Sequence, residues 1–173
     1  MAIESMNGYS LWLLPALEAA DSFQNIIRNL GETFDGPLFP PHITVIGAGA
    51  IKGAEEQLKE RVEKLAQELS PFPIHFTGIE FEDVWHRCLF LRAEKSAALV
   101  DLHNQASEMF GKTPSTSYMP HLSLLYGEFP REEKPKMAES IGGYPDSCTI
   151  DRLALYNVTG MPNEWSQVIR ISL

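Results

Sequence analysis

Two hydrophobic periodicities divide the chain into short strands and amphipathic helices. Apolar residues that alternate or run together between glycine, proline and polar clusters predict strands. Apolar residues that recur every three or four positions predict helices, as in the stripe of Leu58, Val62, Leu65 and Leu69. The expected strands are 9–14, 42–46, 73–82, 84–93, 121–126, 148–158 and 167–171. The expected helices are 18–30, which Gly31 should end, 54–69, 96–110 and 131–140, the last of them exposed.

The order of these elements predicts an α+β fold with two similar lobes. The strands 42–46 and 121–126 each follow a helix and a polar loop, and each precedes a further helix and a strand pair. This layout suits two lobes that face each other across a groove. With 173 residues, the chain is expected to form one domain, residues 1–173, with a sizeable core.

Composition and charge narrow the class of partner. Hydrophobic residues make up 44% of the chain and charged residues 21%, which is typical of a soluble globular protein. The net charge of −9 and the pI of about 5.0 argue against broad binding to nucleic acid or to anionic membranes. We therefore expect a monomer with no membrane partner and no stable nucleic-acid partner. A small phosphorylated substrate stays compatible with a neutral or locally positive pocket.

The cysteines and the start of the chain predict the compartment. Cys88 and Cys148 are too few for a disulfide framework, and their spacing does not resemble a metal site. Residues 1–9 contain no basic region followed by an apolar core, which predicts no secretory signal. No apolar stretch is long enough to span a membrane. These features predict a cytoplasmic protein with free thiols.

Two short motifs nearly repeat each other. Residues 41–45 read PHITV and residues 120–124 read PHLSL, so each apolar run follows a proline. Residues two positions apart on a strand point to the same face. Each copy is therefore expected to place a histidine beside a hydroxyl, His42 with Thr44 and His121 with Ser123. Two copies in one chain make coincidence much less likely than one would, which favours a functional interpretation over a structural one.

This pair of motifs suits the cleavage of a phosphate ester. Such a reaction needs a base for water and an acid for the leaving oxygen, and histidine serves both roles near neutral pH. His42 and His121 are the candidate catalytic residues. The hydroxyls of Thr44 and Ser123 are expected to hydrogen-bond the non-bridging phosphate oxygens. No paired carboxylates flank the motifs and no other histidine lies at ligand spacing, so we expect no metal and no cofactor.

Two aromatic residues are further candidates for the pocket. Trp12 lies among apolar neighbours, where it serves either core packing or the stacking of a base. Tyr126 ends the second motif strand five residues after His121, an odd offset that places it on the opposite face of an ideal strand. A role for Tyr126 in the pocket therefore requires a bend or bulge in that strand.

The remaining histidines are weaker candidates. His75 alternates with core residues of its strand and is expected to face solvent, and His103 lies on a helix face and is expected to be structural. In the expected strand 84–93, Trp85 and His86 point to opposite faces. Either of these two could line the groove, and the sequence leaves this choice open.

The longer motifs resemble a known family. Residues 9–12 (YSLW), 41–45 and especially 118–126 (YMPHLSLLY) are similar to the LigT-like 2H phosphoesterase superfamily, in particular to the cyclic phosphodiesterases of the plant and yeast type. The similarity extends through nearly the whole chain, including residues 88–91 and 151–155. Plant relatives carry more cysteines, which are paired in disulfides, so no redox control is carried over to this chain.

The resemblance implies a fold and a reaction. The family fold is bilobal α+β, with two antiparallel sheets facing a central cleft, helices packed outside and a pseudo-twofold axis. The implied reaction is metal-independent hydrolysis of ADP-ribose 1″,2″-cyclic phosphate to ADP-ribose 1″-phosphate, a step in clearing a by-product of transfer-RNA splicing. Nucleoside 2′,3′-cyclic phosphates are opened to 2′-phosphates.

The resemblance also implies roles for particular residues. His42 and His121 are the acid and base, Thr44 and Ser123 hold the phosphate, and matching positions place Trp12 and Tyr126 in the pocket. We prefer His121 as the base and His42 as the acid, although the sequence does not determine the direction.

Two alternatives stay open at this point. One is a 2H phosphoesterase that acts on RNA, either a 2′-5′ phosphodiesterase or ligase or an exonuclease that trims RNA ends. The acidic balance and the lack of basic patches speak against a long RNA substrate. The other is a nucleotide-binding module without catalysis, which the intact histidines and hydroxyls of both motifs argue against.

Overall fold

The computed structural model describes residues 6–173. The expectation of no secretory signal therefore rests mainly on residues outside the described part of the chain. The elements, in chain order, are β1 (Tyr9–Pro15), α1 (Leu17–Phe34), β2 (Ile43–Ile51), α2 (Glu55–Gln67), β3 (Phe72–Glu80), the 3-10 turn η1 (Trp85–Arg87), β4 (Leu89–Ala93), α3 (Ala97–Met109), β5 (His121–Leu125), α4 (Lys134–Glu139), β6 (Ser147–Asn157), η2 (Pro162–Glu164) and β7 (Ser166–Ser172).

The strands form one curved antiparallel sheet whose two halves match the two expected lobes. One half is β2-β1-β6-β7 and the other is β5-β4-β3. The halves are joined at two places, by the pairing of β3 with the start of β6 and by a single residue pair between β2 and β5. The expected α+β architecture is confirmed, and its two sheets are hydrogen-bonded to each other in one seven-stranded system.

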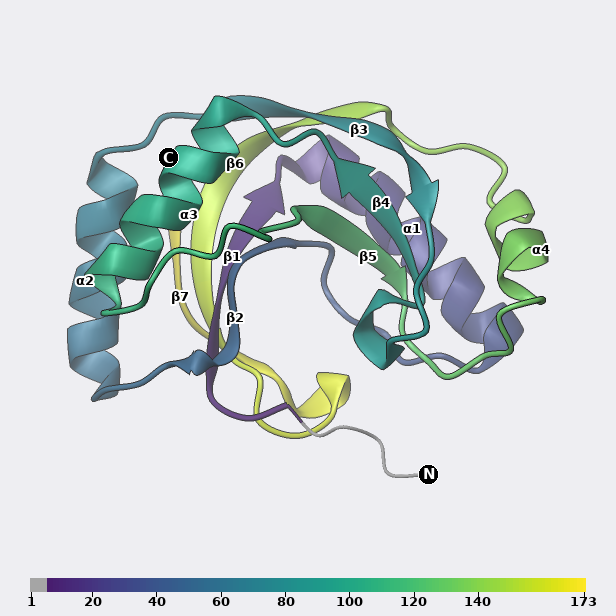
Figure 1. Cartoon of the computed structure of the whole chain (residues 1–173), viewed down its shortest axis with the longest axis horizontal. Helices are drawn as coiled ribbons and strands as arrows, with labels where there is room; N and C mark the ends of the chain where they lie inside the picture. Colours follow the sequence, from purple (N-terminus) through teal and green to yellow (C-terminus); the bar gives the residue numbers. More distant parts are fainter. Residues whose placement is uncertain (1–5) are drawn as a thin grey trace.

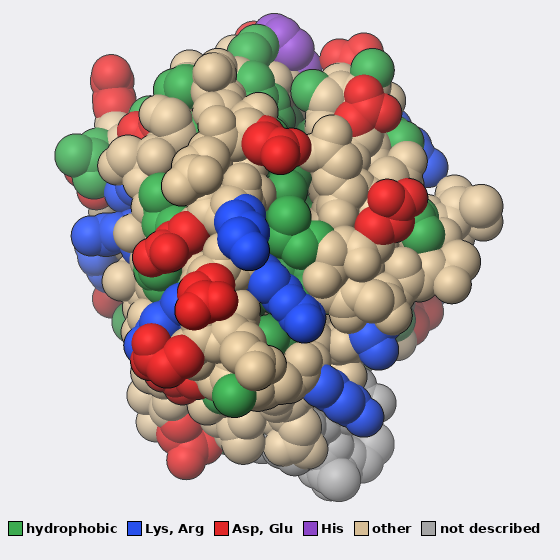
Figure 2. All heavy atoms as spheres, turned by 90° about the vertical axis from the view of Figure 1, so that its left-hand side faces the viewer, with side chains coloured by type: hydrophobic (Ala, Val, Ile, Leu, Met, Phe, Trp, Pro, Cys, Tyr) green, Lys and Arg blue, Asp and Glu red, His purple; other side chains and the backbone are tan. Residues whose placement is uncertain are grey.

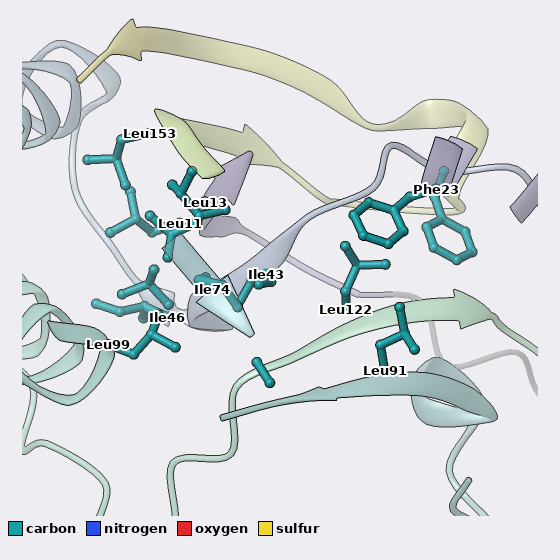
Figure 3. Packing of buried hydrophobic residues seen from close by; sticks show 14 of the residues in the cluster. Leu11, Leu13, Phe23, Ile43, Ile46, Ile74, Leu91, Leu99, Leu122 and Leu153 are labelled. Atoms are coloured by element: carbon teal, nitrogen blue, oxygen red, sulfur yellow. The ribbon is translucent and has the colours of Figure 1, made fainter. Parts of the chain in front are cut away.

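The helices cover the outside of the curved sheet (Figure 1). Helix α1 packs against β5 and β1, α2 against β6 and β7, and α3 against β2. The face of the sheet beneath them carries the main core, in which Leu11 and Leu13 of β1 and Leu153 of β6 are fully buried. Figure 3 shows these three side chains together, with Leu91 and Leu122 on the other half of the sheet. The alternating apolar residues of the strands thus bury one face and leave the concave face free for a site.

The sequence predicts that helix α1 ends at Gly31, but the helix does not end there. The helix continues to Phe34 and ends at Asp35, which has a left-handed φ of 55° and donates its N–H to the carbonyl of Gly31. A Cβ on Gly31 would lie 3.0 Å from the carbonyl oxygen of Gly36. Gly31 is therefore needed for the close approach of the returning chain, and tertiary packing outweighs its low helix propensity.

The expected strand 84–93 begins only at Leu89. Residues Trp85–Arg87 form a 3-10 turn, in which the N–H of Arg87 donates to the carbonyl of Val84 over 2.9 Å. The turn is anchored by Lys134, whose Nζ donates to the carbonyl of Glu82 over 2.6 Å and to Asp83 Oδ1 over 2.8 Å. Lys134 is only 1% exposed, so the expectation of an exposed helix is wrong at this position.

The outer surface carries charges of both signs. Figure 2 shows acidic and basic side chains next to each other on the side that carries α2. On that helix Lys59 lies 2.8 Å from Glu56 and 3.5 Å from Glu55. Within residues 6–173, no helix has the length and apolar character needed to cross a membrane.

Both cysteines are buried free thiols, Cys88 directly before β4 and Cys148 in β6. Burial raises the pKa of Cys88 to about 11 and that of Cys148 to about 12. Both thiols are therefore protonated at neutral pH.

Candidate active site

A single cross-strand pair brings the two motifs together. Ile43 of β2 lies opposite Leu122 of β5, and both side chains are fully buried in the core. Because side chains alternate along a strand, the residues on either side of each point to the concave face. In an antiparallel pair this register places His42 opposite Ser123 and Thr44 opposite His121.

Each motif strand has a β-bulge directly after its hydroxyl residue. Between Leu11↔Ile46 and Trp12↔Thr44, strand β1 advances by one residue and β2 by two, so Val45 is the extra residue. Strand β5 likewise gains Leu124 between its pairings with Phe90 and Leu89 of β4.

These bulges explain the position of Tyr126. An extra residue reverses the alternation of side chains, so Leu124 and Leu125 are both buried in the core. Tyr126 then returns to the face of His121 and lines the cavity. The same reversal in β2 places Gly47 at the cavity wall. The bulge that a pocket role of Tyr126 required is therefore present.

The two histidines are held in the same way. His42 Nδ1 lies 2.7 Å from the carbonyl oxygen of Pro40, and His121 Nδ1 lies 2.9 Å from that of Met119, in each case two residues earlier. A carbonyl only accepts, so each Nδ1 carries a hydrogen. Nε2 is then the nitrogen left to exchange protons with a ligand.

The concave face contains a cavity of about 760 Å³ that all six sequence-predicted site residues line. These residues are His42, Thr44, His121, Ser123, Trp12 and Tyr126. None of the described residues that line the cavity is Lys, Arg, Asp or Glu. The histidines are therefore the groups of this wall that can become positively charged when an anion binds.

Burial keeps both histidines neutral in the free protein. Desolvation lowers the pKa of His42 from 6.5 to about 4, a shift opposed by its hydrogen bond to Pro40 and reinforced by His121. Desolvation also lowers the pKa of His121, against the effect of its bond to Met119. An anionic phosphate in the cavity would oppose both shifts and favour protonation of one ring.

Trp12 supports His42 and does not offer a free face to a base. Its ring lies 3.6 Å from the His42 ring at 10° and 4.1 Å from the Tyr156 ring at 19°. Two rings stacked so closely and with so little offset lie on opposite faces of the indole. Its Nε1 donates to Ser10 Oγ over 2.7 Å, and Ser10 donates to the carbonyl of Ile46 over 3.0 Å. The indole therefore fixes the plane of His42.

Tyr126 is also enclosed. Its ring stacks on Phe39 at 3.8 Å and lies 5.1 Å from the Trp85 ring. Burial raises the pKa of Tyr126, and a hydrogen bond with Ser123 partly offsets this. Ser123 Oγ donates to the carbonyl of His86 over 2.9 Å, which ties this hydroxyl to the 3-10 turn.

Comparison with protein families places the chain among known proteins. The family described as the 2′-5′ RNA ligase superfamily matches residues 18–161, most of the chain. The chain belongs to the 2′-5′ RNA ligase superfamily. This result confirms the resemblance to the 2H phosphoesterases that the two motifs indicate.

Two individual proteins are similar to this superfamily member over about two thirds of its length or more. A cyclic phosphodiesterase of Arabidopsis thaliana is 29% identical over 146 residues, which cover 84% of this chain and 78% of the relative. A putative phosphoesterase of Geobacillus thermodenitrificans is 26% identical over 118 residues, 67% of each chain.

Solved structures show the same fold. E. coli LigT complexed with 3′-AMP has a TM-score of 0.62 at 14% identity and covers 98% of this chain and 99% of its own. Usb1 of Kluyveromyces marxianus has a TM-score of 0.54 at 13% identity, with 98% and 99% covered. At these identities the likeness concerns the fold alone.

The structure of this superfamily member resolves one open choice and adds one aromatic residue. His86 lines the cavity, whereas Trp85 lies against Tyr126 in a neighbouring hollow. Trp165 also lines the cavity, is partly exposed and meets Trp12 and Tyr126 edge-on. The sequence contained no pattern that indicated Trp165, because it lies in an irregular segment between β6 and β7.

Stability should fall in acid because His42 is buried as a neutral group. Between pH 6.5 and about 4 the unfolded chain binds a proton at His42 that the folded chain does not, so the free energy of unfolding decreases as the pH falls. We expect His42 to contribute on the order of 3 kcal/mol to the difference between pH 7 and pH 4. Urea unfolding of the wild type and of His42→Gln at both pH values measures this contribution. Equal pH dependence in the two proteins would contradict it.

Proposed function

We propose that the protein is a metal-independent cyclic phosphodiesterase that acts on small nucleotide-like substrates. The observation that carries the proposal is the pair of matched half-sites, in which each histidine lies opposite the hydroxyl residue of the other motif in the strand register and all four residues line one cavity. The name of the Arabidopsis relative supports the same activity class. Its substrates would be ADP-ribose 1″,2″-cyclic phosphate and nucleoside 2′,3′-cyclic phosphates, and its product in the latter case the 2′-phosphate.

The reaction would divide between the two imidazoles. Neutral Nε2 of one histidine takes a proton from water as its oxygen bonds to phosphorus. Protonated Nε2 of the other gives a proton to the ribose oxygen as its bond to phosphorus breaks. Protons balance over one cycle because one ring gains the proton that the other loses. The hydroxyl of Thr44 would donate to a non-bridging oxygen as its charge increases. The hydroxyl of Ser123 would do the same by turning its hydrogen from the carbonyl of His86 to the phosphate.

The pKa shifts favour a direction opposite to the preference stated from sequence. Burial lowers the pKa of His42 to about 4, so this ring is neutral at neutral pH and its Nε2 carries no hydrogen, as a base requires. The acid must instead arrive protonated, which leaves this role to His121, although burial lowers its pKa as well. We therefore propose His42 as the base for water and His121 as the acid for the leaving oxygen.

The walls of the cavity favour a small ester over a polymer. Because no lysine or arginine is among the described lining residues, the site offers no fixed cation for a row of phosphates. Trp165 is the partly exposed aromatic side chain suited to stack on a nucleobase. Action as a monomer and a cytoplasmic location are part of the same proposal.

The direct test uses the two cyclic substrates with and without excess EDTA. We expect hydrolysis of ADP-ribose 1″,2″-cyclic phosphate and 2′,3′-cyclic AMP, with ³¹P NMR showing the 1″-phosphate and the 2′-phosphate. Within residues 6–173 no three His, Cys, Asp or Glu side chains are grouped to hold a metal ion. Activity should be equal in the two conditions. Loss in EDTA that a divalent cation restores would contradict a metal-independent mechanism.

Two further outcomes would replace the proposal. Faster cleavage of a 2′-5′-linked oligonucleotide or of RNA ends than of 2′,3′-cyclic AMP would assign the protein to RNA processing. Tight binding of 2′,3′-cyclic AMP with no product after hours would indicate a binding module. Cleavage of the oligonucleotide and binding of the cyclic nucleotide are measured on the same preparation, with the wild-type rate of 2′,3′-cyclic AMP hydrolysis as the reference.

A further inference from the structure

The bulge in β2 turns two successive carbonyl groups away from β1. With Val45 as the extra residue, the peptide groups that follow Thr44 and Val45 have the same orientation. Strand β5 does not pair with these carbonyls, because its single pair with β2 is Ile43 with Leu122. Buried carbonyls without a partner destabilise a fold, so the segment needs donors from elsewhere.

Two side chains from outside the sheet supply those donors. The hydroxyl of Tyr118 donates to the carbonyl of Thr44 over 3.0 Å. His103 Nδ1, on α3, donates to the carbonyl of Val45 over 2.9 Å. The two donor rings stack on each other at 4.0 Å with an angle of 2° between their planes. They therefore hold the bulge as one unit.

The same pair is bound to the chain that leads into the second motif. His103 Nε2 accepts the backbone N–H of Ser115 over 3.0 Å, so both nitrogens of its ring are used. Tyr118 directly precedes Met119, whose carbonyl accepts from His121 Nδ1 over 2.9 Å. One short segment thus holds the backbone of Thr44 and, one residue later, the imidazole of His121.

We propose that the stacked His103–Tyr118 pair is a positioning element for the reaction, which sets the hydroxyl of Thr44 relative to the imidazole of His121. Neither ring is among the residues that line the cavity, so both act through other groups. Because the two motif strands share only one residue pair, this external support determines their relative position beyond Ile43 and Leu122. The inference rests on the proposed hydrolysis and adds to it the elements that align the two halves.

Tyr118→Phe tests the pair with a minimal change. The ring and its stacking remain, and only the hydrogen bond to Thr44 is removed. We expect kcat for 2′,3′-cyclic AMP to fall roughly 10- to 100-fold, the cost of a misplacement on the order of 1 Å, while KM changes far less. Tyr144→Phe removes a hydroxyl from the segment between α4 and β6, outside the cavity and outside this pair, and should keep the wild-type kcat. An unchanged kcat in Tyr118→Phe, or an equal loss in Tyr144→Phe, would overturn the proposal.

Two substitutions of His103 provide a rescue comparison. In His103→Asn the side-chain amide can still donate to Val45, although it no longer reaches Ser115. In His103→Leu both hydrogen bonds are lost. If the pair positions β2, His103→Asn should retain several-fold more kcat than His103→Leu at a similar KM. Equal kcat values in two folded variants would contradict the role of the bond to Val45.

A readout without turnover separates this inference from the proposed function. In ¹H–¹⁵N NMR spectra, Tyr118→Phe should shift the backbone amide signals of Val45 and His121, whereas Tyr144→Phe should leave them in place. This result would support the positioning of the motifs even if the wild type opened no cyclic phosphate. Unmoved signals of Val45 and His121 in Tyr118→Phe would overturn it, whatever the activity.

Discussion

His42→Ala and His121→Ala are each expected to lower turnover of 2′,3′-cyclic AMP by roughly 10²- to 10⁴-fold, the usual contribution of a positioned acid or base. Each ring has its Nδ1 fixed on a backbone carbonyl and its Nε2 free for a ligand. Removing either ring removes one of the two proton transfers. The double variant should be little worse than the single ones, because residues that act as a unit are not additive.

A matched histidine elsewhere provides the control. His75 is exposed on β3, outside the cavity, and His75→Ala should keep the wild-type rate. Steady-state rates with circular dichroism of each variant separate loss of chemistry from loss of fold. A folded His42→Ala protein that opens the cyclic nucleotide at a near wild-type rate would contradict the paired-histidine mechanism.

The same variants test the direction of proton transfer. A phosphodiester with a p-nitrophenol leaving group needs little help from an acid. If His121 is the acid, His121→Ala should lose much less activity on this ester than on 2′,3′-cyclic AMP, whereas His42→Ala should be impaired on both. The reverse pattern would restore the assignment preferred from sequence.

Trp12→Ala is expected to have the largest effect on stability, a loss of about 3–5 kcal/mol in the free energy of unfolding. The indole is 1% exposed and is enclosed between His42 and Tyr156. Its removal leaves a cavity and releases the plane of His42. Turnover should therefore fall in the folded fraction as well. Urea unfolding at pH 7 measures the first effect and kcat the second.

Trp165→Ala is the matched comparison for Trp12→Ala. Trp165 lines the same cavity but is partly exposed, so its loss should cost less stability and act mainly on KM for a nucleotide. If Trp12→Ala destabilised the protein no more than Trp165→Ala and raised KM instead, Trp12 would be a base-stacking residue and not a support for His42.

The sequence predicted most of the elements, and a set of residues that the fold brings to one cavity, where local pattern decides them. Alternation and proline predict strands at both motifs, and the repeat alone singles out His42, Thr44, His121 and Ser123. It failed where distant contacts outweigh local preference. Helix α1 continues through Gly31, because the returning chain at Gly36 packs closely against this glycine.

The Trp85–Arg87 segment is the second such case. Its pattern predicts a strand, but it forms a turn, and buried Lys134 from far along the chain anchors this turn through Glu82 and Asp83. The sequence also predicts a structural role for His103, but not its partners. The carbonyl of Val45 and the N–H of Ser115, which its ring binds, lie on segments that only the fold brings near.

By itself the sequence determined which groups the two motifs carry, namely two imidazoles and two hydroxyls spaced to share one face of each strand. Only the tertiary structure decided how these four groups meet. The pairing of Ile43 with Leu122 sets each histidine against the hydroxyl of the other motif. The physical reason is that alternation along a strand is a local property of the backbone, whereas register, bulges and burial depend on contacts between residues far apart in the chain.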